Sequence, residues 1–287
     1  MLHLIPDLQS ITLTFLPDKD SLTNPFAYGV NLSRYQLLQL NVLEGMAYNP
    51  NPLPTLQSLH INSWFAFCHE LYATAPFQAI AASLQDLRFL VQDTEFKGEA
   101  DHRPAVDFLK DVIELRVLRP AVSLTSLAMK SSVEFGWLFR LDLNSITFPS
   151  LTELSLTNSV WDDGTVDPEG AIPGVEDFIL CHGKTLKILG LHACTICVPH
   201  DRSTPVRSWA AVWNGFAEEL TELVILEVVY NQLRYGYFRP NHGFDKNSSV
   251  LLNGTEEDTP AFEALLAIAS KRQLSNPSKT EKSWWCK

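Results

Sequence analysis

The stretch Phe148-Pro-Ser-Leu151-Thr-Glu-Leu154-Ser-Leu156 is a nonamer that recurs almost unchanged at two other places in the chain. It recurs as Ile5-Pro-Asp-Leu8-Gln-Ser-Ile11-Thr-Leu13 and as Leu53-Pro-Thr-Leu56-Gln-Ser-Leu59-His-Ile61. The common element is a frame of three apolar residues, Leu-x-x-Leu-x-Leu. Because internal repeats tens of residues apart are typical of stacked repeat folds, this frame is the main guide to the architecture.

The same frame occurs elsewhere without the leading proline. The further copies are Leu84/Leu87/Phe89, Leu124/Leu127/Met129, Leu186/Leu189/Leu191 and Leu223/Leu226/Val228, with Tyr35/Leu38/Leu40 as a looser eighth copy. The last two apolar residues of the frame point to one side of a short strand. Stacking such units makes a parallel sheet with one buried face. The frame therefore predicts an α/β fold, an irregular leucine-rich-repeat solenoid (horseshoe) with a parallel concave sheet and helices on the convex face. An amphipathic helix, which also spaces leucines by three, is the alternative.

Helical patterns lie between the frames. We expect helices over 104–119, 175–182, 208–220 and 259–272, since apolar residues recur there at i, i+3, i+4 and i+7, and Gly183 stands where a helix ends. The solenoid is predicted to span 1–272, with about eight repeats and a loop insertion near 237–257. Residues 273–287 are predicted to be a loose C-terminal tail.

Composition limits the class of protein and its partners. The net charge is −11 and no Lys/Arg stripe is present, which argues against nucleic acid as a partner. No run approaches the ~20 apolar residues of a membrane span, and the first residues do not resemble a secretion signal. The five cysteines form an odd, irregular set, typical of reduced thiols. We therefore expect a cytoplasmic or nuclear protein with neither nucleic acid nor membrane as its partner.

Motifs for catalysis are absent from the sequence. His69-Glu70 begins a zinc-protease motif, but its fifth position is Ala73. The set Cys181, His182, His192, Cys194, Cys197 and His200 has zinc-like spacing, which leaves metal or redox chemistry as an alternative. However, Cys194 falls on a small buried position of the repeat, and His182 ends an apolar helix face. We therefore predict no enzyme, no catalytic residues, no metal and no cofactor. The acidic run of Glu256, Glu257 and Asp258 is expected to be solvated.

Partner-binding residues are predicted on the concave face of the sheet, where the residues between the inward apolar positions point outward. They are His60, Arg88, Lys130, Ser155, Ile188, His192, Val224, Ile225, Glu227 and Val229. Four of them make an apolar patch in the last repeats, namely Ile188, Val224, Ile225 and Val229. This patch is either a contact site or, as we favour, is covered by the 237–257 loop and the tail.

A resemblance to a known family rests on the region from Ala171 to Tyr237. It contains Val175-Glu-Asp-Phe-Ile-Leu-Cys-His-Gly-Lys-Thr-Leu-Lys-Ile-Leu-Gly-Leu-His-Ala-Cys194 and Arg207-Ser-Trp-Ala-Ala-Val-Trp-Asn-Gly-Phe-Ala-Glu-Glu-Leu220, and residues 137–156 and 261–272 follow the same pattern. These segments resemble the C-terminal repeats of filamentous-fungal (ascomycete-type) F-box-associated leucine-rich-repeat proteins. The last half of the chain resembles them well, and the first half only as generic repeats.

Members of that family are substrate receptors of SCF-type ubiquitin ligases, in which an N-terminal F-box docks the ligase and the repeats hold the target. The resemblance implies a non-catalytic solenoid that binds a target protein on its concave face. It implies SCF ligase subunits as partners if an F-box exists in the full gene product. Because the first repeat starts at Ile5 with no F-box before it, the chain is expected to be either a truncated F-box protein or a repeat scaffold or regulatory protein with no ligase link.

Overall fold

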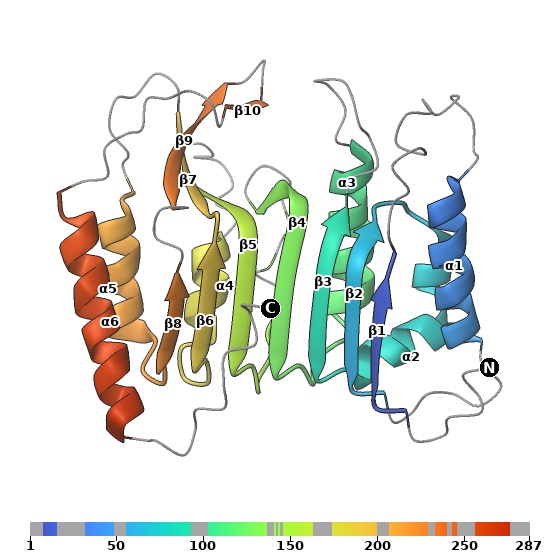
Figure 1. Cartoon of the computed structure of the whole chain (residues 1–287), viewed down its shortest axis with the longest axis horizontal. Coiled ribbons are helices and arrows are strands. Elements are labelled where there is room, and N and C mark those ends of the chain that lie inside the picture. The colour runs from blue at the N-terminus through green and yellow to red at the C-terminus, as the bar shows by residue number, and fades with distance from the viewer. Residues whose placement is uncertain are drawn as a thin grey trace.

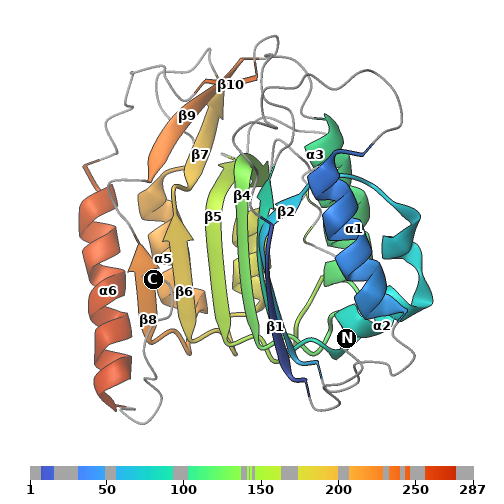
Figure 2. The same ribbon diagram turned by 45° about the vertical axis from the view of Figure 1, so that its right-hand side comes forward.

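Ten strands form one sheet in the computed structural model, and helices pack against one face of that sheet (Figure 1, Figure 2). The described residues are 8–15, 32–48, 56–92, 103–136, 141, 143, 146–162, 174–199, 207–228, 233–239, 243–245 and 256–275. The strands are β1 Ser10–Thr14, β2 Ser58–Phe65, β3 Asp86–Gln92, β4 Ser126–Gly136, β5 Glu153–Asp162, β6 Ile188–His192, β7 Thr195–Pro199, β8 Ile225–Val228, β9 Arg234–Arg239 and β10 Gly243–Asp245. The prediction of an α/β fold with a parallel sheet is confirmed.

Helices connect the strands along the chain. They are α1 Arg34–Ala47, the 3-10 helix η3 Glu70–Ala73, α2 Ala75–Ser83, α3 Arg103–Asp107, the π-helix η4 Phe108–Leu118, α4 Val175–Cys181, α5 Trp209–Glu219 and α6 Asp258–Ser275. Both ribbon views place α1 at the β1 end of the sheet and α6 beside β8 at the other end. Within the described ranges, no helix is both long enough and apolar enough to cross a membrane.

Seven copies of the frame form seven neighbouring parallel strands, β1, β2, β3, β4, β5, β6 and β8. Their registers align the middle residue of each copy in one row across the sheet. That row consists of Thr12, His60, Arg88, Ala128, Ser155, Gly190 and Glu227. The residues predicted to point away from the core therefore share one face, which we call the outer face.

A single backbone carbonyl in each copy joins its strand to the next one. The carbonyl of Gln9 accepts hydrogen bonds from the N–H groups of both Gln57 and Ser58, each at 2.9 Å. The same double acceptance recurs at the carbonyls of Gln57, Gln85, Thr125, Thr152 and Lys187. Each acceptor directly follows the first apolar residue of its frame, so the frame itself sets the register between strands.

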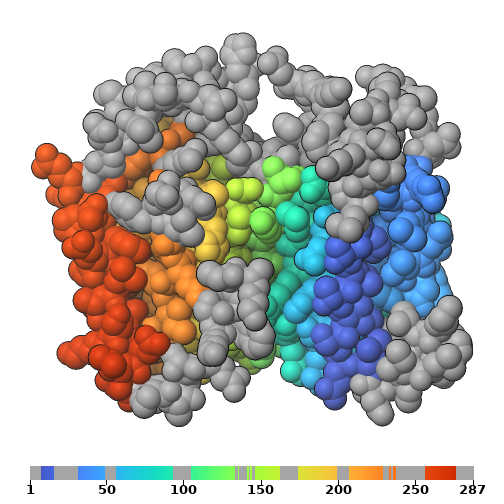
Figure 3. All heavy atoms as spheres, in the orientation of Figure 1, coloured from blue at the N-terminus to red at the C-terminus, as the bar shows by residue number. Residues whose placement is uncertain are grey.

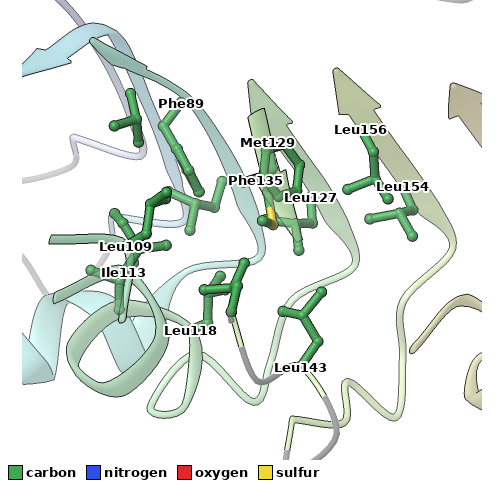
Figure 4. Close-up of a cluster of buried hydrophobic side chains, with 14 of the residues drawn as sticks. Phe89, Leu109, Ile113, Leu118, Leu127, Met129, Phe135, Leu143, Leu154 and Leu156 are labelled. Carbon is green, nitrogen blue, oxygen red and sulfur yellow. The ribbon is translucent and has the colours of Figure 1, made fainter. Parts of the chain in front are cut away.

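The apolar residues of the frames make the core together with the helices. Figure 4 shows Phe89, Leu127, Met129, Leu154 and Leu156 of three adjacent strands on one side of the sheet, with Leu109, Ile113 and Leu118 of η4 and its C-terminal end on that side. Leu127, Leu154 and Leu156 have no exposed surface. Since fully burying such a side chain is worth about 1.5–3 kcal/mol, the repeated frame provides much of the driving force for folding.

The looser copy at Tyr35/Leu38/Leu40 is not a strand, so the prediction of an eighth copy is wrong. Ser33 and Gln36 start a helix there by a capping box. The Gln36 N–H donates to Ser33 Oγ (3.2 Å), and the Ser33 N–H donates to Gln36 Oε1 (2.9 Å). Leu38 is 52% exposed instead of buried, and β1 pairs directly with β2.

The other predicted helices are confirmed with small changes. The helix expected over 104–119 is mostly the π-helix η4, and α6 extends to Ser275, three residues into the expected tail. Gly183 follows α4 as expected, and a Cβ at this position would collide with the backbone of Glu219. Strands β9 and β10 lie partly within the segment expected to be a loop over 237–257.

The alternation along β3 predicts that the same substitution costs much more stability at one position than at another. Leu87 points into the core with no exposed surface, whereas Leu90 points to the outer face and is half-buried. Leu87→Ala should reduce the free energy of unfolding by about 2–5 kcal/mol, because it leaves a cavity. Leu90→Ala should cost less than about 1 kcal/mol. Denaturant unfolding of both variants measures this, and equal costs would contradict the register.

Candidate functional site

The outer face carries the candidate site, and Figure 3 views the molecule from this side. Of the predicted binding residues, eight lie on it by register: His60, Arg88, Lys130, Ser155, Ile188, His192, Ile225 and Glu227. Val224 directly precedes β8, and Val229 lies outside the described residues. The structure therefore gathers on one face side chains that the sequence spreads from His60 to Glu227.

Two of the predicted residues, His60 and Arg88, are joined by a carboxylate that the prediction missed. Asp86 Oδ2 lies 2.8 Å from His60 Nε2, and Asp86 Oδ1 accepts from Arg88 Nε at 3.0 Å. The Ser58 hydroxyl donates to Asp86 Oδ2 at 3.1 Å. These residues of β2 and β3 form what we call the Asp86 network. Because all its side chains are only partly exposed, the network holds His60 and Arg88 in fixed positions at the surface.

The pKa of Asp86 reflects this environment. Partial burial alone would raise it, but hydrogen bonds from His60 and Arg88, together with their charges, outweigh burial and lower the pKa of Asp86 to about 2. The carboxylate is therefore ionised at neutral pH and stabilises the position of both neighbours.

The Asp86 network contains serine, histidine and aspartate, but its geometry differs from that of a nucleophilic triad. In a triad, the aspartate bonds to one ring nitrogen of the histidine and the serine to the other. Here Ser58 Oγ, at 3.2 Å, and Asp86 Oδ2 both approach His60 Nε2. His60 in this arrangement cannot pass a proton from the serine while the aspartate holds its opposite side. The geometry suits binding by charge and hydrogen bonds.

A second group of charged side chains spans β4, β6 and β8. Desolvation lowers the pKa of His192, the positive charge of Lys130 lowers it further, and the carboxylate of Glu227 raises it. Lys130 is exposed, whereas His192 and Glu227 are half-buried. On the outer face, Lys130 of β4 and Glu227 of β8 carry opposite charges on either side of His192 of β6.

The predicted apolar patch in the last strands is largely inaccessible. Ile188 is 9% exposed and Val224 is 8% exposed, and Ser155 on the neighbouring strand is 3% exposed. Ile225 remains half-buried. Val224 lines a pocket together with Ile268 and Arg272, which belong to the last turns of α6. Helix α6 thus covers part of Val224, whereas the expected cover, the 237–257 loop and the tail, lies mostly outside the described residues.

Among the described residues, the cysteine–histidine set does not gather into one cluster, although Cys181 Sγ lies 3.2 Å from His182 Nδ1. His182 is buried and has both ring nitrogens engaged: Nδ1 lies 2.7 Å from the carbonyl of Phe178, and Nε2 accepts from the N–H of Phe148 at 3.0 Å. His182 therefore adopts the neutral form with the proton on Nδ1. Burial lowers its pKa, which the bond to the Phe178 carbonyl opposes.

Cys194 is held by hydrogen bonds inside the sheet. Its thiol is fully buried, accepts from Ser159 Oγ at 3.0 Å and points to the carbonyls of Leu156 and His192. Burial raises the pKa of the Cys194 thiol to about 11, so it stays protonated. In the described ranges, no three His, Cys, Asp or Glu side chains are grouped so that they could hold a metal ion. His200 lies outside those ranges.

Asp258 contradicts the expectation of a solvated acidic run. Its carboxylate is 4% exposed, accepts from the N–H of Ala210 at 2.7 Å, and accepts from the hydroxyl of Tyr235 at 2.7 Å. The Tyr235 oxygen in turn accepts from the N–H of Trp209 at 2.8 Å. Because α5 begins at Trp209, these groups satisfy N–H groups at the positive end of its dipole. Asp258 thereby fixes the start of α6 to the start of α5.

Comparison with known proteins found no match: no family model, no curated protein and no solved structure resembles the chain significantly. The site is therefore defined by its own geometry. Prediction from the sequence placed eight residues on the outer face, where the strand registers put them. It missed Ser58 and Asp86, although Asp86 stands two residues before Arg88 on the same side of its strand, where a carboxylate can reach the arginine.

The pKa of Asp86 predicts a defined loss of stability in acid. Its lowered value means that the folded state keeps the ionised carboxylate while the unfolded state, at 3.8, becomes protonated. The stabilisation is present above about pH 4 and is lost as the pH falls toward 2. Asp86→Asn should reduce the free energy of unfolding at pH 7 by on the order of 2 kcal/mol. Denaturant unfolding at pH 7, 4 and 2 measures this.

The difference between the parent chain and Asp86→Asn should shrink between pH 4 and pH 2. A matched control is Asp111→Asn, which changes an exposed carboxylate on η4 and should leave stability almost unaltered. If both variants lose the same stability at pH 7, the Asp86 network does not stabilise the sheet.

The buried neutral His182 predicts a loss of stability at mildly acidic pH. As the pH falls below 6.5, the unfolded state takes up a proton that the folded state resists, so stability decreases. His182→Ala should cost about 1–3 kcal/mol at pH 7, because the buried N–H of Phe148 loses its acceptor. Between pH 7 and pH 5, the free energy of unfolding of this variant should also change less than that of the parent chain. Some slope remains from His192, and an unchanged slope would contradict this role.

Proposed function

We propose that the chain is a leucine-rich-repeat protein that binds a protein ligand on the outer face of its sheet. Seven copies of one frame, joined by the same carbonyl contact at each step, support a repeat solenoid. The described helices lie on the opposite face or, like α6, at an end of the sheet, whereas the candidate residues lie on the outer face (Figure 1, Figure 3).

One observation supports this binding role most strongly. The Asp86 network fixes His60 and Arg88 across two strands while their side chains stay partly exposed. A surface whose charged groups are already ordered loses less conformational entropy on binding. The second group, around Lys130, adds charges of both signs along the same face. Such a pattern favours a folded protein or peptide with complementary charges over a flexible polyanion.

The narrower part of the proposal is a role as the substrate-holding part of an SCF-type ubiquitin-ligase receptor. Its support is the resemblance of the region from Ala171 to Tyr237 to F-box-associated repeats. In that role the target protein binds the outer face, and the ligase subunits bind an F-box in the full gene product. The alternative, a repeat scaffold, binds a protein on the same outer face but does not bind ligase subunits.

A charge reversal on the outer face should test the binding role. Lys130 is exposed on β4, so Lys130→Glu should leave the fold intact. The reversed charge should weaken the binding of partners that contact this face. Lys110→Glu is the matched control, because Lys110 is an exposed lysine of η4 on the helical side. Tagged parent chain and both variants are used to capture proteins from cells of the native source, and the captured proteins are compared by quantitative mass spectrometry.

The proposal expects at least one protein that the parent chain and Lys110→Glu retain and that Lys130→Glu loses by tenfold or more. Identical protein sets for all three chains would refute binding through the outer face. Cullin and its adaptor subunits, captured with the native full gene product, would support the ligase role. Their absence would support the scaffold alternative.

A further inference from the structure

A pocket of about 480 Å³ lies at the β8 end of the sheet and shares Val224 with the predicted apolar patch. One wall is the last part of α6, with Ile268, Lys271 and Arg272. The opposite wall comes from Lys187, which precedes β6, and from the turn between α5 and β8, with Glu222 and Val224. Its volume falls within the ~300–1,000 Å³ that is usual for small-molecule sites.

Positive charge dominates this pocket although the chain as a whole is acidic, with a net charge of −11. Three cationic side chains, Lys187, Lys271 and Arg272, face one carboxylate, Glu222. Arg272 donates to the carbonyl of Leu220 at 2.7 Å and so holds α6 against the end of α5. Among the residues that the structure describes, neither Lys187 nor Lys271 has a carboxylate within ion-pair distance. Elsewhere Arg88, Arg119 and Arg207 are paired with Asp86, Glu114 and Glu176.

We propose that this pocket binds an anionic group, a phosphate or a carboxylate, carried on an apolar stem. The two lysines supply charge for the anion, and Val224 and Ile268 supply an apolar surface for the stem. Both features are needed in one ligand, because a bare anion would leave the apolar wall unused and a neutral apolar ligand would leave the charges unpaired. The site is separate from the outer-face charges, so it does not depend on the proposed protein ligand.

Hydrogen bonds hold the walls of the pocket in place. Arg272 and the Asp258 contacts hold α6 to α5 at both ends of the shared interface. The backbone of Lys187 is fixed as well, since its carbonyl accepts from the N–H groups of Val224 and Ile225. The two lysine side chains therefore project from anchored elements and can converge on an anion without moving the backbone.

Calorimetric titration of the full chain with three probes tests the proposal. Phenyl phosphate and benzoate carry a phosphate or a carboxylate on the same apolar ring, and phenol carries the ring without the charge. The parent chain should bind at least one of the two anions, and an increase in salt should weaken that binding. The stronger of the two identifies the anion. The double variant Lys187→Ala/Lys271→Ala should bind it at least tenfold more weakly.

A matched control removes two exposed lysines outside the pocket, Lys110 and Lys184, and should bind as the parent chain does. Glu222→Gln, which removes the carboxylate of the pocket, should strengthen binding severalfold. Arg272 is left unchanged because it fixes α6. Binding of phenol as tight as that of the anions, equal binding by the double variant, or no binding of either anion would overturn the proposal.

Discussion

The carbonyl that follows the first leucine of each frame receives two N–H groups from the next strand, and this contact fixes the rest of the sheet. It occurs six times from Gln9 to Lys187, always at the same frame position. Because side chains alternate along a strand, a shift by one residue would expose the leucines and bury the charges. The repeated contact therefore decides at once which residues form the core and which form the outer face.

A second repeated constraint bends the chain after three of the seven frames. Ser63, Asn158 and Ala193 have positive φ angles of 62°, 65° and 50°, and each stands seven positions after the first leucine of its frame. The next position holds Ser159 in β5 and Cys194 just before β7, and these two side chains bond to each other. Beyond the bend the chain pairs again, as when β7 joins β5 and β9. A left-handed residue costs free energy outside glycine, so its return at one position indicates a built turn.

Most of the fold could be predicted from local sequence patterns. The remaining features depend on contacts between residues that are far apart in the sequence. The seven frames and the helices over 175–182 and 208–220 follow from spacing alone. The copy at Tyr35 failed because a local signal, the capping box of Ser33 and Gln36, outweighed the leucine spacing. In the site, the outward positions were predictable from alternation, whereas the burial of Ser155 and Asp258 was not. It depends on segments that meet only in the folded chain, as when Asp258 reaches the N–H of Ala210, 48 positions earlier.

Helix α6 both stabilises the last strands and forms a wall of the pocket beside them. A buried carboxylate is costly unless it is fully hydrogen-bonded, and Asp258 meets this condition with Ala210 and Tyr235. The helix that begins with this contact ends beside Val224, where Arg272 binds the last carbonyl of α5. Closing the end of the sheet in this way covers apolar surface that a further strand would otherwise cover. It also brings the cations of α6 to Lys187, so the pocket is a direct consequence of how the sheet is closed.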